Sequence, residues 1–129
     1  RNTAVLFADG SGAVVLEASD TGSQLLGWDI DADGSAEKYL YAELGGTIQM
    51  EGKEVFRRAV RIMVDSAQKS MAAAGITADQ LSIVVPHQAN IRIIQDHGRV
   101  NRGDYVLLVG FGAGMTAASA VLRWGGGAA

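Results

Sequence analysis

The chain has 129 residues, of which 48% are hydrophobic and 19% are charged, and this balance is typical of one soluble globular domain. Its formal net charge of −3, with 11 Lys and Arg residues scattered along the sequence, argues against a nucleic-acid-binding protein. Because there is no cysteine, and the two histidines come without a cluster of ligands, neither a disulfide, nor a thiolate nucleophile, nor a metal site is predicted.

The same features bear on where the protein resides. No apolar run approaches the roughly 20 residues that a membrane-spanning helix requires. The start, Arg1-Asn2-Thr3, resembles neither a signal peptide nor a transit peptide. We therefore expect a cytoplasmic protein without a membrane segment.

The first predicted elements are two short strands. Apolar runs at residues 3–8 and 13–17 flank Asp-Gly-Ser-Gly at residues 9–12, a composition typical of tight turns. We therefore expect a hairpin at the start of the chain.

Residues 27–46 have a mixed composition that includes three alternating aspartates. The spacing of Asp29, Asp31 and Asp33 resembles a calcium-binding loop, but no glutamate stands at the closing position of such a loop. A solvated surface loop is the favoured interpretation, and no metal is assigned to it.

Residues 51–74 are predicted to form one long helix. Apolar side chains recur there at spacings of three and four, which indicates a single buried stripe. Gly75 follows as a C-terminal cap, and residues 77–80 have the form of a capping box that opens at most a short turn. The stripe consists of Val55, Phe56, Ala59, Val60, Ile62, Met63, Ala67 and Met71.

A histidine follows the next predicted strand. Residues 81–85 form a compact apolar run bounded by Pro86, and His87 then precedes a pattern that suits the first turns of a helix. Ligands bind at such places in open α/β sheets, because backbone donors and the helix dipole converge there. From the residues alone, a histidine held by ordinary core hydrogen bonds is the alternative.

The last third contains two predicted strands, at residues 105–109 and 115–124, separated by a glycine-rich bend at residues 110–114. Gly103-Asp104 marks a turn before the first of them. Such a bend lets backbone N–H groups face a ligand oxygen without hindrance from side chains. A nucleotide fingerprint is not indicated, because a strand and not a helix follows the bend.

Four motifs, in this order, resemble the β-ketoacyl-acyl carrier protein (ACP) synthase III family. The resemblance covers nearly the whole chain, and four ordered motifs are more specific than any one of them. They are FADGSGA at residues 7–13, MEGKEVF at residues 50–56, VPHQAN at residues 85–90, and the run from RGD at residues 102–104 to GFGAG at residues 110–114.

The resemblance implies an α/β protein with a thiolase-like fold of α-β-α-β-α layers, built from two similar halves per subunit. Residues 1–27 would be the final hairpin of the N-terminal half, and residues 28–129 would belong to the C-terminal half. The fold would be incomplete in this chain, and apolar surface would be exposed where the N-terminal half should cover it.

The resemblance also implies a reaction. In the family, a cysteine takes an acyl group from acyl-CoA, and the thioester condenses with malonyl-ACP as carbon dioxide leaves. His87 matches the family histidine, whose Nε2–H donates to the malonyl thioester carbonyl and stabilises the enolate. The substrates are coenzyme A and carrier-protein thioesters, the family is a homodimer, and no cofactor is implied.

Further site residues are carried over from the same motifs. The loop with Phe111, Gly112 and Ala113 matches the one that completes the oxyanion hole, with the backbone N–H of Ala113 as the donor. Asn90 falls where the family lines the pantetheine channel, and Gln88 beside it could be purely structural. Arg92 falls where a basic residue docks the carrier protein, although an ordinary solvated helix residue is an equal alternative.

Two departures from the family pattern stand out. The catalytic cysteine would lie before Arg1, and the catalytic asparagine would lie in a segment of some tens of residues for which Gln95-Asp96 leaves no room. We expect a gap at residues 95–96, either where a piece is missing from the sequence or where a paralogue is naturally shortened. Such a deletion in a buried layer would expose hydrophobic core.

Two classes of function therefore remain open. The first is a condensing enzyme in fatty acid biosynthesis, or a polyketide starter-unit ketosynthase or acyltransferase relative with the same motifs. The second is a non-catalytic remnant that binds a carrier protein or a partner subunit, and this chain alone is expected to be inactive.

Overall fold

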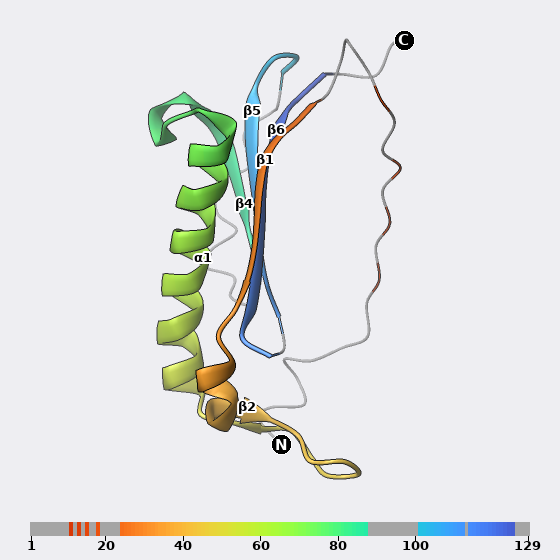
Figure 1. Ribbon diagram of the computed structural model, residues 1–129, viewed down its shortest axis with the longest axis vertical. Coiled ribbons are helices and arrows are strands. Elements are labelled where there is room, and N and C mark those ends of the chain that lie inside the picture. Colours follow the sequence, from red (N-terminus) through yellow and green to blue (C-terminus); the bar gives the residue numbers. More distant parts are fainter. Residues whose placement is uncertain are drawn as a thin grey trace.

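The described part of the chain forms a four-stranded sheet that one long helix covers on one face (Figure 1). The computed structural model describes residues 24–87, 101–112 and 114–125 and the single positions 11, 13, 15 and 18. The predicted hairpin at the start, the predicted gap at residues 95–96, and the site residues Asn90, Arg92 and Ala113 lie outside this part.

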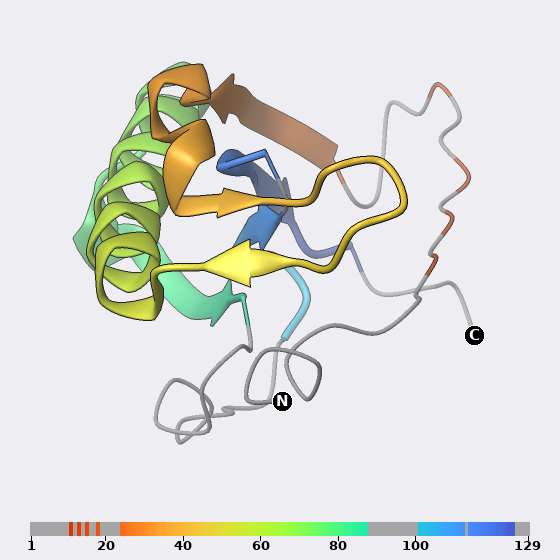
Figure 2. The same cartoon turned by 90° about the horizontal axis from the view of Figure 1, so that it is seen from below.

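The sheet mixes parallel and antiparallel pairs in the order β1-β6-β5-β4. Strand β6 is antiparallel to both of its neighbours, whereas β4 and β5 are parallel. A small β2–β3 ribbon lies at the end of the sheet where α1 begins (Figure 2). The elements are β1 (Gln24–Ala32), η1 (Gly34–Tyr39), β2 (Leu40–Tyr41), β3 (Gln49–Met50), α1 (Gly52–Ala74), η2 (Ala78–Gln80), β4 (Leu81–Pro86), β5 (Tyr105–Gly112) and β6 (Thr116–Arg123).

The long helix confirms the periodicity of the sequence, but its buried face is narrower than predicted. α1 ends at Gly75, which has a left-handed φ of 69° as a C-terminal cap should. Phe56 is 57% exposed and Val60 is 40% exposed, so these two members of the predicted stripe point away from the sheet. Val55 and Ala59 of the predicted stripe are buried. The two fully buried positions of the helix are the small residues Ser66 and Ser70, because the helix approaches the sheet closely.

The prediction of a solvated loop around the alternating aspartates is wrong. Asp29 and Asp31 lie within β1, where they pair with Ser119 and Ala117 of β6. Their period of two is that of a strand, and it aims both carboxylates at the face that carries α1. Lys69 of α1 donates to Asp31 at 3.0 Å, so the charge is matched across the interface.

Hydroxyl groups and a glycine join α1 to the sheet. The Oγ of Ser119 donates to the backbone carbonyl of Ser66 at 2.8 Å, and the two Oγ atoms are also 2.8 Å apart. A Cβ on Gly27 would stand 2.2 Å from the carbonyl oxygen of Ser70. These contacts set the helix close to β1 and β6, over an apolar cluster formed by Leu26, Met63, Ala67, Met71, Ala74, Leu81, Leu107, Val109 and Val121.

The smaller predictions have mixed outcomes. The capping box of Thr77 and Gln80 is present and opens the single turn η2. Strand β5 runs on through Gly112, so the glycine-rich bend is shorter than predicted. The predicted division between residues 27 and 28 falls inside β1, and the division stays a prediction. Among the described residues, no helix is long and apolar enough to cross a membrane.

We predict that Gly27→Ala destabilises the chain by about 1–3 kcal/mol, because the added methyl group would overlap the backbone of α1. Urea unfolding followed by circular dichroism measures the change. Gly34→Ala is the matched control, since a Cβ there meets nothing within 4 Å, and it should shift stability by less than about 0.5 kcal/mol. Equal effects of the two substitutions would contradict the close approach.

Candidate functional site

His87 stands directly after β4, at the carboxyl end of the parallel pair. The last paired residue of β4, Pro86, lies opposite Val109 of β5. The ring of His87 is 6.2 Å from that of Phe111, centroid to centroid, and the ring planes are tilted by 59°. The parallel pairing therefore brings together two residues that the sequence motifs place far apart.

Phe111 packs against a second apolar cluster, separate from the one between α1 and the sheet. It packs against a core of four buried residues that come from η1, β2, α1 and the turn before β6. Because this cluster fixes Phe111, it also fixes one wall beside His87. The four residues are Ala36, Leu40, Val55 and Met115.

The turn from β5 to β6 has an unusual backbone. Gly114 has φ 75° and Met115 has φ 52°, so a non-glycine residue adopts the left-handed conformation there. The side chain of Met115 is only 1% exposed, and its carbonyl accepts a hydrogen bond from the N–H of Asp33 at 3.1 Å. Burial and this bond stabilise the strained conformation of Met115.

Charged groups tie the same region together. Arg58 of α1 donates to the carboxylate of Asp33 at 2.9 Å and lies 4.9 Å from the centre of the Tyr39 ring. The hydroxyl of Ser35 also donates to Asp33 and, with Arg58, lowers the pKa of that carboxyl. Arg58 therefore anchors η1 to the first half of α1, beneath the apolar cluster.

A second ionic contact lies farther along the helix. The ammonium of Lys69 donates to Asp65 of α1 at 2.9 Å and to Asp31 of β1 at 3.0 Å. The bond from Lys69 lowers the pKa of Asp31, and the bonds to Asp65 and Asp31 raise the pKa of Lys69. The pairs Arg58–Asp33 and Lys69–Asp31 thus stabilise the contact between α1 and the β1 side of the sheet.

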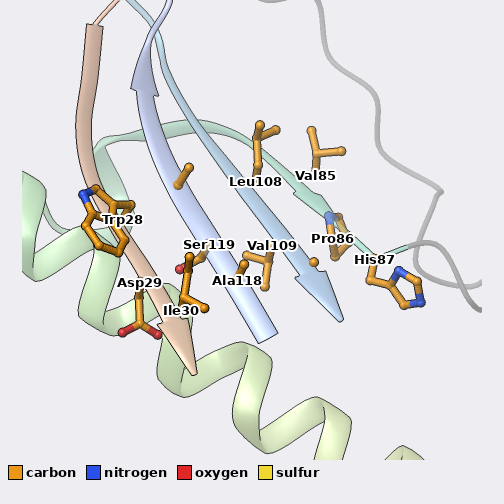
Figure 3. A pocket seen from close by; sticks show the side chains of 12 residues that line it. Trp28, Asp29, Ile30, Val85, Pro86, His87, Leu108, Val109, Ala118 and Ser119 are labelled. Atoms are coloured by element: carbon orange, nitrogen blue, oxygen red, sulfur yellow. The ribbon is translucent and has the colours of Figure 1, made fainter. Parts of the chain in front are cut away.

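His87 lies at the rim of a broad hollow on the face of the sheet opposite α1 (Figure 3). The hollow has a volume of about 830 Å³ and is mostly apolar. All four main strands contribute to its lining, which includes Trp28, Ile30, Val85, Leu108, Ala118 and Ala120. The motifs gave no indication of this surface, but the alternation of apolar residues along β1 could have revealed it.

Of the predicted site residues, the structure thus brings His87 and Phe111 together and places Gly112 at the end of β5, opposite Thr116. Among the described residues, no group of three or more potential metal ligands is found. What the arrangement offers is a histidine beside an aromatic ring, next to a glycine-rich turn and an apolar surface.

Comparisons with known families agree with this arrangement. Residues 1–34 match the family described as 3-oxoacyl-[acyl-carrier-protein (ACP)] synthase III, and residues 95–124 match the C-terminal part of the same family. The β-ketoacyl-ACP synthase III 1 of Bacillus cereus is 37% identical over 161 residues, covering 97% of this chain and 51% of the relative. The chain belongs to the β-ketoacyl-ACP synthase III family.

Solved structures show the same relationship. The synthase III of Aquifex aeolicus superposes with a TM-score of 0.80 at 34% identity, over 96% of this chain and 52% of that protein. The synthase III of Thermus thermophilus superposes with a TM-score of 0.78 at 34% identity, over 98% of this chain and 54% of that protein. The sheet and helix are therefore part of a thiolase-like α/β fold, and the chain spans about half the length of the synthase III relatives that it matches.

The synthase III relatives contain residues that this chain lacks internally. Since 97% of the chain is about 125 residues, about 36 of the 161 positions aligned with the Bacillus cereus protein have no counterpart here. For the Roseiflexus castenholzii relative, which is 35% identical over 178 residues and 98% of the chain, the surplus is about 52. The C-terminal match begins at residue 95, where the motifs predict the gap.

The ion pairs predict how stability depends on pH. Asp31 and Asp33 have lowered pKa values in the folded chain, so their contribution is present above the usual carboxyl value of 3.8 and is lost as pH falls through the folded values. We expect the double variant Asp31→Asn, Asp33→Asn to be less stable than the parent at pH 6. The difference should shrink as the pH falls below the usual carboxyl value and these groups take up protons.

Urea unfolding between pH 2 and pH 7 measures this difference. Glu43→Gln, in the turn between β2 and β3, removes a carboxylate away from the helix and is the control. A stability difference for the double variant that stays constant over the whole pH range would contradict the assignment.

Proposed function

We propose that this chain supplies the histidine side of a β-ketoacyl-ACP synthase III active site, in fatty acid biosynthesis or in the priming of a polyketide. The reaction is the decarboxylative condensation of an acyl group, taken from acyl-CoA, with malonyl-ACP. One observation carries the proposal: in a chain of this family, His87 stands at the carboxyl end of β4 against Phe111.

His87 acts on the malonyl thioester. Its Nε2–H donates to the thioester carbonyl oxygen, where negative charge develops when the bond to the carboxylate breaks and carbon dioxide leaves. The electron pair of that bond forms the enolate, whose carbon attacks the acyl thioester and expels the thiolate that carried the acyl group.

The turn after β5 serves the acyl group. The backbone N–H of Ala113 donates to the oxyanion that forms on the acyl thioester, while Gly112 leaves space for the carbonyl to approach. Phe111 shields the reacting atoms from water. The fixed conformation of Met115 supports this role, since an oxyanion donor must be positioned before the reaction begins.

Two further residues contact the substrate outside the reacting centre. Asn90 lines the channel for the pantetheine arm, and Arg92 pairs with an acidic residue of the carrier protein. The substrates acyl-CoA and malonyl-ACP carry their own thioesters, so the reaction needs no cofactor. The protein acts in the cytoplasm as a homodimer.

A second candidate function follows from the composition. Because the 129 residues include no cysteine, the acyl-carrying thiol must come from residues outside these. A protein that never acquires this thiol would bind a carrier protein or a partner subunit without catalysis. The two candidates differ in whether acyl transfer occurs at all.

The test separates the two half-reactions on the purified protein that the gene encodes, after its intact mass has been compared with 13.5 kDa. Transfer of a radiolabelled acetyl group from acetyl-CoA to the protein reports the first half-reaction. Release of carbon dioxide from malonyl-ACP reports the second. We expect His87→Ala to lower carbon dioxide release at least about 100-fold while acyl transfer survives.

The other histidine of the chain provides the control. His97→Ala should leave both half-reactions within about twofold of the parent, and circular dichroism should show that each variant is folded. Undiminished condensation in folded His87→Ala protein would refute the role of this histidine. If the parent protein performs neither half-reaction but still binds malonyl-ACP, the enzyme function is refuted and the binding function is supported.

A further inference from the structure

The turn between β5 and β6 lies at the end of the sheet where η1 follows β1 (Figure 1). At this end, the pairing of β6 with β5 stops at Gly112 and Thr116, and its pairing with β1 stops at Ala32 and Thr116. The N–H of Asp33 then donates to the carbonyl of Met115 at 3.1 Å. This bond extends the contact with β1 by one residue into the β5–β6 turn, so Asp33 holds the backbone of the turn from outside.

Asp33 is also bonded through its carbonyl and through both oxygens of its carboxylate. The carbonyl accepts a hydrogen bond from the N–H of Ala36 at 3.1 Å. The Oδ1 atom accepts from the N–H of Ser35 at 3.1 Å and from its hydroxyl at 2.5 Å, and the Oδ2 atom accepts from Arg58 at 2.9 Å. The orientation of the Asp33 N–H is therefore coupled to its side-chain contacts, and the contact with Arg58 is the one that reaches α1.

Arg58 is itself restrained by its surroundings. Its side chain is 31% exposed, and its guanidinium carbon lies 4.9 Å from the centre of the Tyr39 ring. Tyr39 packs against the apolar cluster that contains Met115. Val55, three residues before Arg58 on α1, belongs to the same cluster. Arg58 is thus joined to the β5–β6 turn by two routes, the ion pair with Asp33 and the contact with Tyr39.

Met115 is a residue of the turn whose conformation needs support from its surroundings. Its φ of 52° is one that residues other than glycine rarely adopt, and such a conformation persists only where the neighbouring structure enforces it. Without the ion pair to Arg58, Asp33 could turn its N–H away from the Met115 carbonyl, and the strained residue could relax. Relaxation would rotate the peptide groups that precede Met115 in the turn.

We propose that Arg58 is a positioning residue for acyl transfer: through Asp33 it holds Met115 in the left-handed conformation and so orients the backbone donor of the β5–β6 turn. The inference rests on the proposed function, because the turn receives an oxyanion only if an acyl thioester is attacked. In this role Arg58 needs no contact with the substrate. It affects the steps in which an acyl thioester carbonyl becomes tetrahedral, and not the decarboxylation assigned to His87.

The test measures transfer of radiolabelled acetyl groups from acetyl-CoA to the purified protein that the gene encodes. Single-turnover measurements give the maximal rate constant and the acetyl-CoA concentration for half-maximal rate separately. Loss of a whole oxyanion donor costs about 10²–10³-fold in rate, and displacement of a donor costs less. We therefore expect Arg58→Met, which keeps a long side chain without its charge, to lower the maximal rate constant roughly tenfold.

Other quantities should change little in Arg58→Met. The acetyl-CoA concentration for half-maximal rate should stay within about twofold of the parent, because the donor acts on the transition state and not on binding. Carbon dioxide release from malonyl-ACP should also stay within about twofold. This pattern is the reverse of the one expected for His87→Ala, so the two roles are distinguished in the same assays.

Two further single variants separate positioning from general stability. Arg58→Lys keeps a cation, and because the ion pair uses one guanidinium nitrogen, this variant should stay within about threefold of the parent rate. Lys69→Met breaks the ion pair between α1 and Asp31 of β1, farther along the helix, and should leave the rate within about twofold of the parent.

A double-mutant cycle tests whether Arg58 acts through Asp33. Asp33→Asn should reproduce the loss of rate seen in Arg58→Met, because it breaks the same ion pair. The variant with both substitutions should be within about twofold of either single variant, since one contact is lost only once. Circular dichroism shows whether each variant is folded, and Asp33→Asn carries the test if Arg58→Met fails to fold.

Three results would overturn the positioning role. Unchanged acetyl transfer in folded Arg58→Met or Asp33→Asn protein would refute it while the proposed function stands. An equal loss of rate in Lys69→Met would show that the general stability of the α1 contact, and not the position of the turn, accounts for the effect. A parent protein that transfers no acetyl group would refute the proposed function and, with it, the role of Arg58.

Discussion

The close contact of α1 with β1 and β6 determines the rest of the structure. Because Gly27 has no Cβ, the backbone of the helix can approach β1 more closely than any larger residue would allow. The buried hydroxyls of Ser66 and Ser119, which would otherwise lack partners, are hydrogen-bonded across the same contact. A looser contact would leave room for larger apolar residues. The actual contact is tight, so the most buried residues of α1 have small side chains, and the ion pairs of Asp31 and Asp33 form beside this contact.

This contact also positions the candidate site. The start of α1 and the turn η1 are joined through Arg58 and Asp33, and they enclose the cluster on which Phe111 rests. The parallel pairing of β4 and β5 then sets His87 beside Phe111. The candidate site thus lies where a parallel pair ends, on a scaffold that is held by contacts on the other face of the sheet.

The sequence predicted correctly those elements whose local patterns, such as a helical period or a cap residue, do not depend on tertiary contacts. The period of residues 51–74 and the cap at Gly75 gave α1 almost to the residue. The alternating aspartates misled the prediction because Asp31 and Asp33 form ion pairs with cations of α1, which no local pattern reveals. Phe56 and Val60 were assigned to the core for a similar reason, since their exposure depends on how closely α1 approaches the sheet.

The candidate site divides in the same way. His87 and Phe111 followed from motifs, but their proximity depends on strand order, which the sequence alone does not determine. The motifs also say nothing of the hollow on the sheet face opposite α1, at whose rim His87 lies. Under the proposed function His87 donates to a developing enolate, and such a hydrogen bond is strong only where water is excluded. Shielding of this hollow from water would therefore strengthen the bond that the proposal assigns to His87.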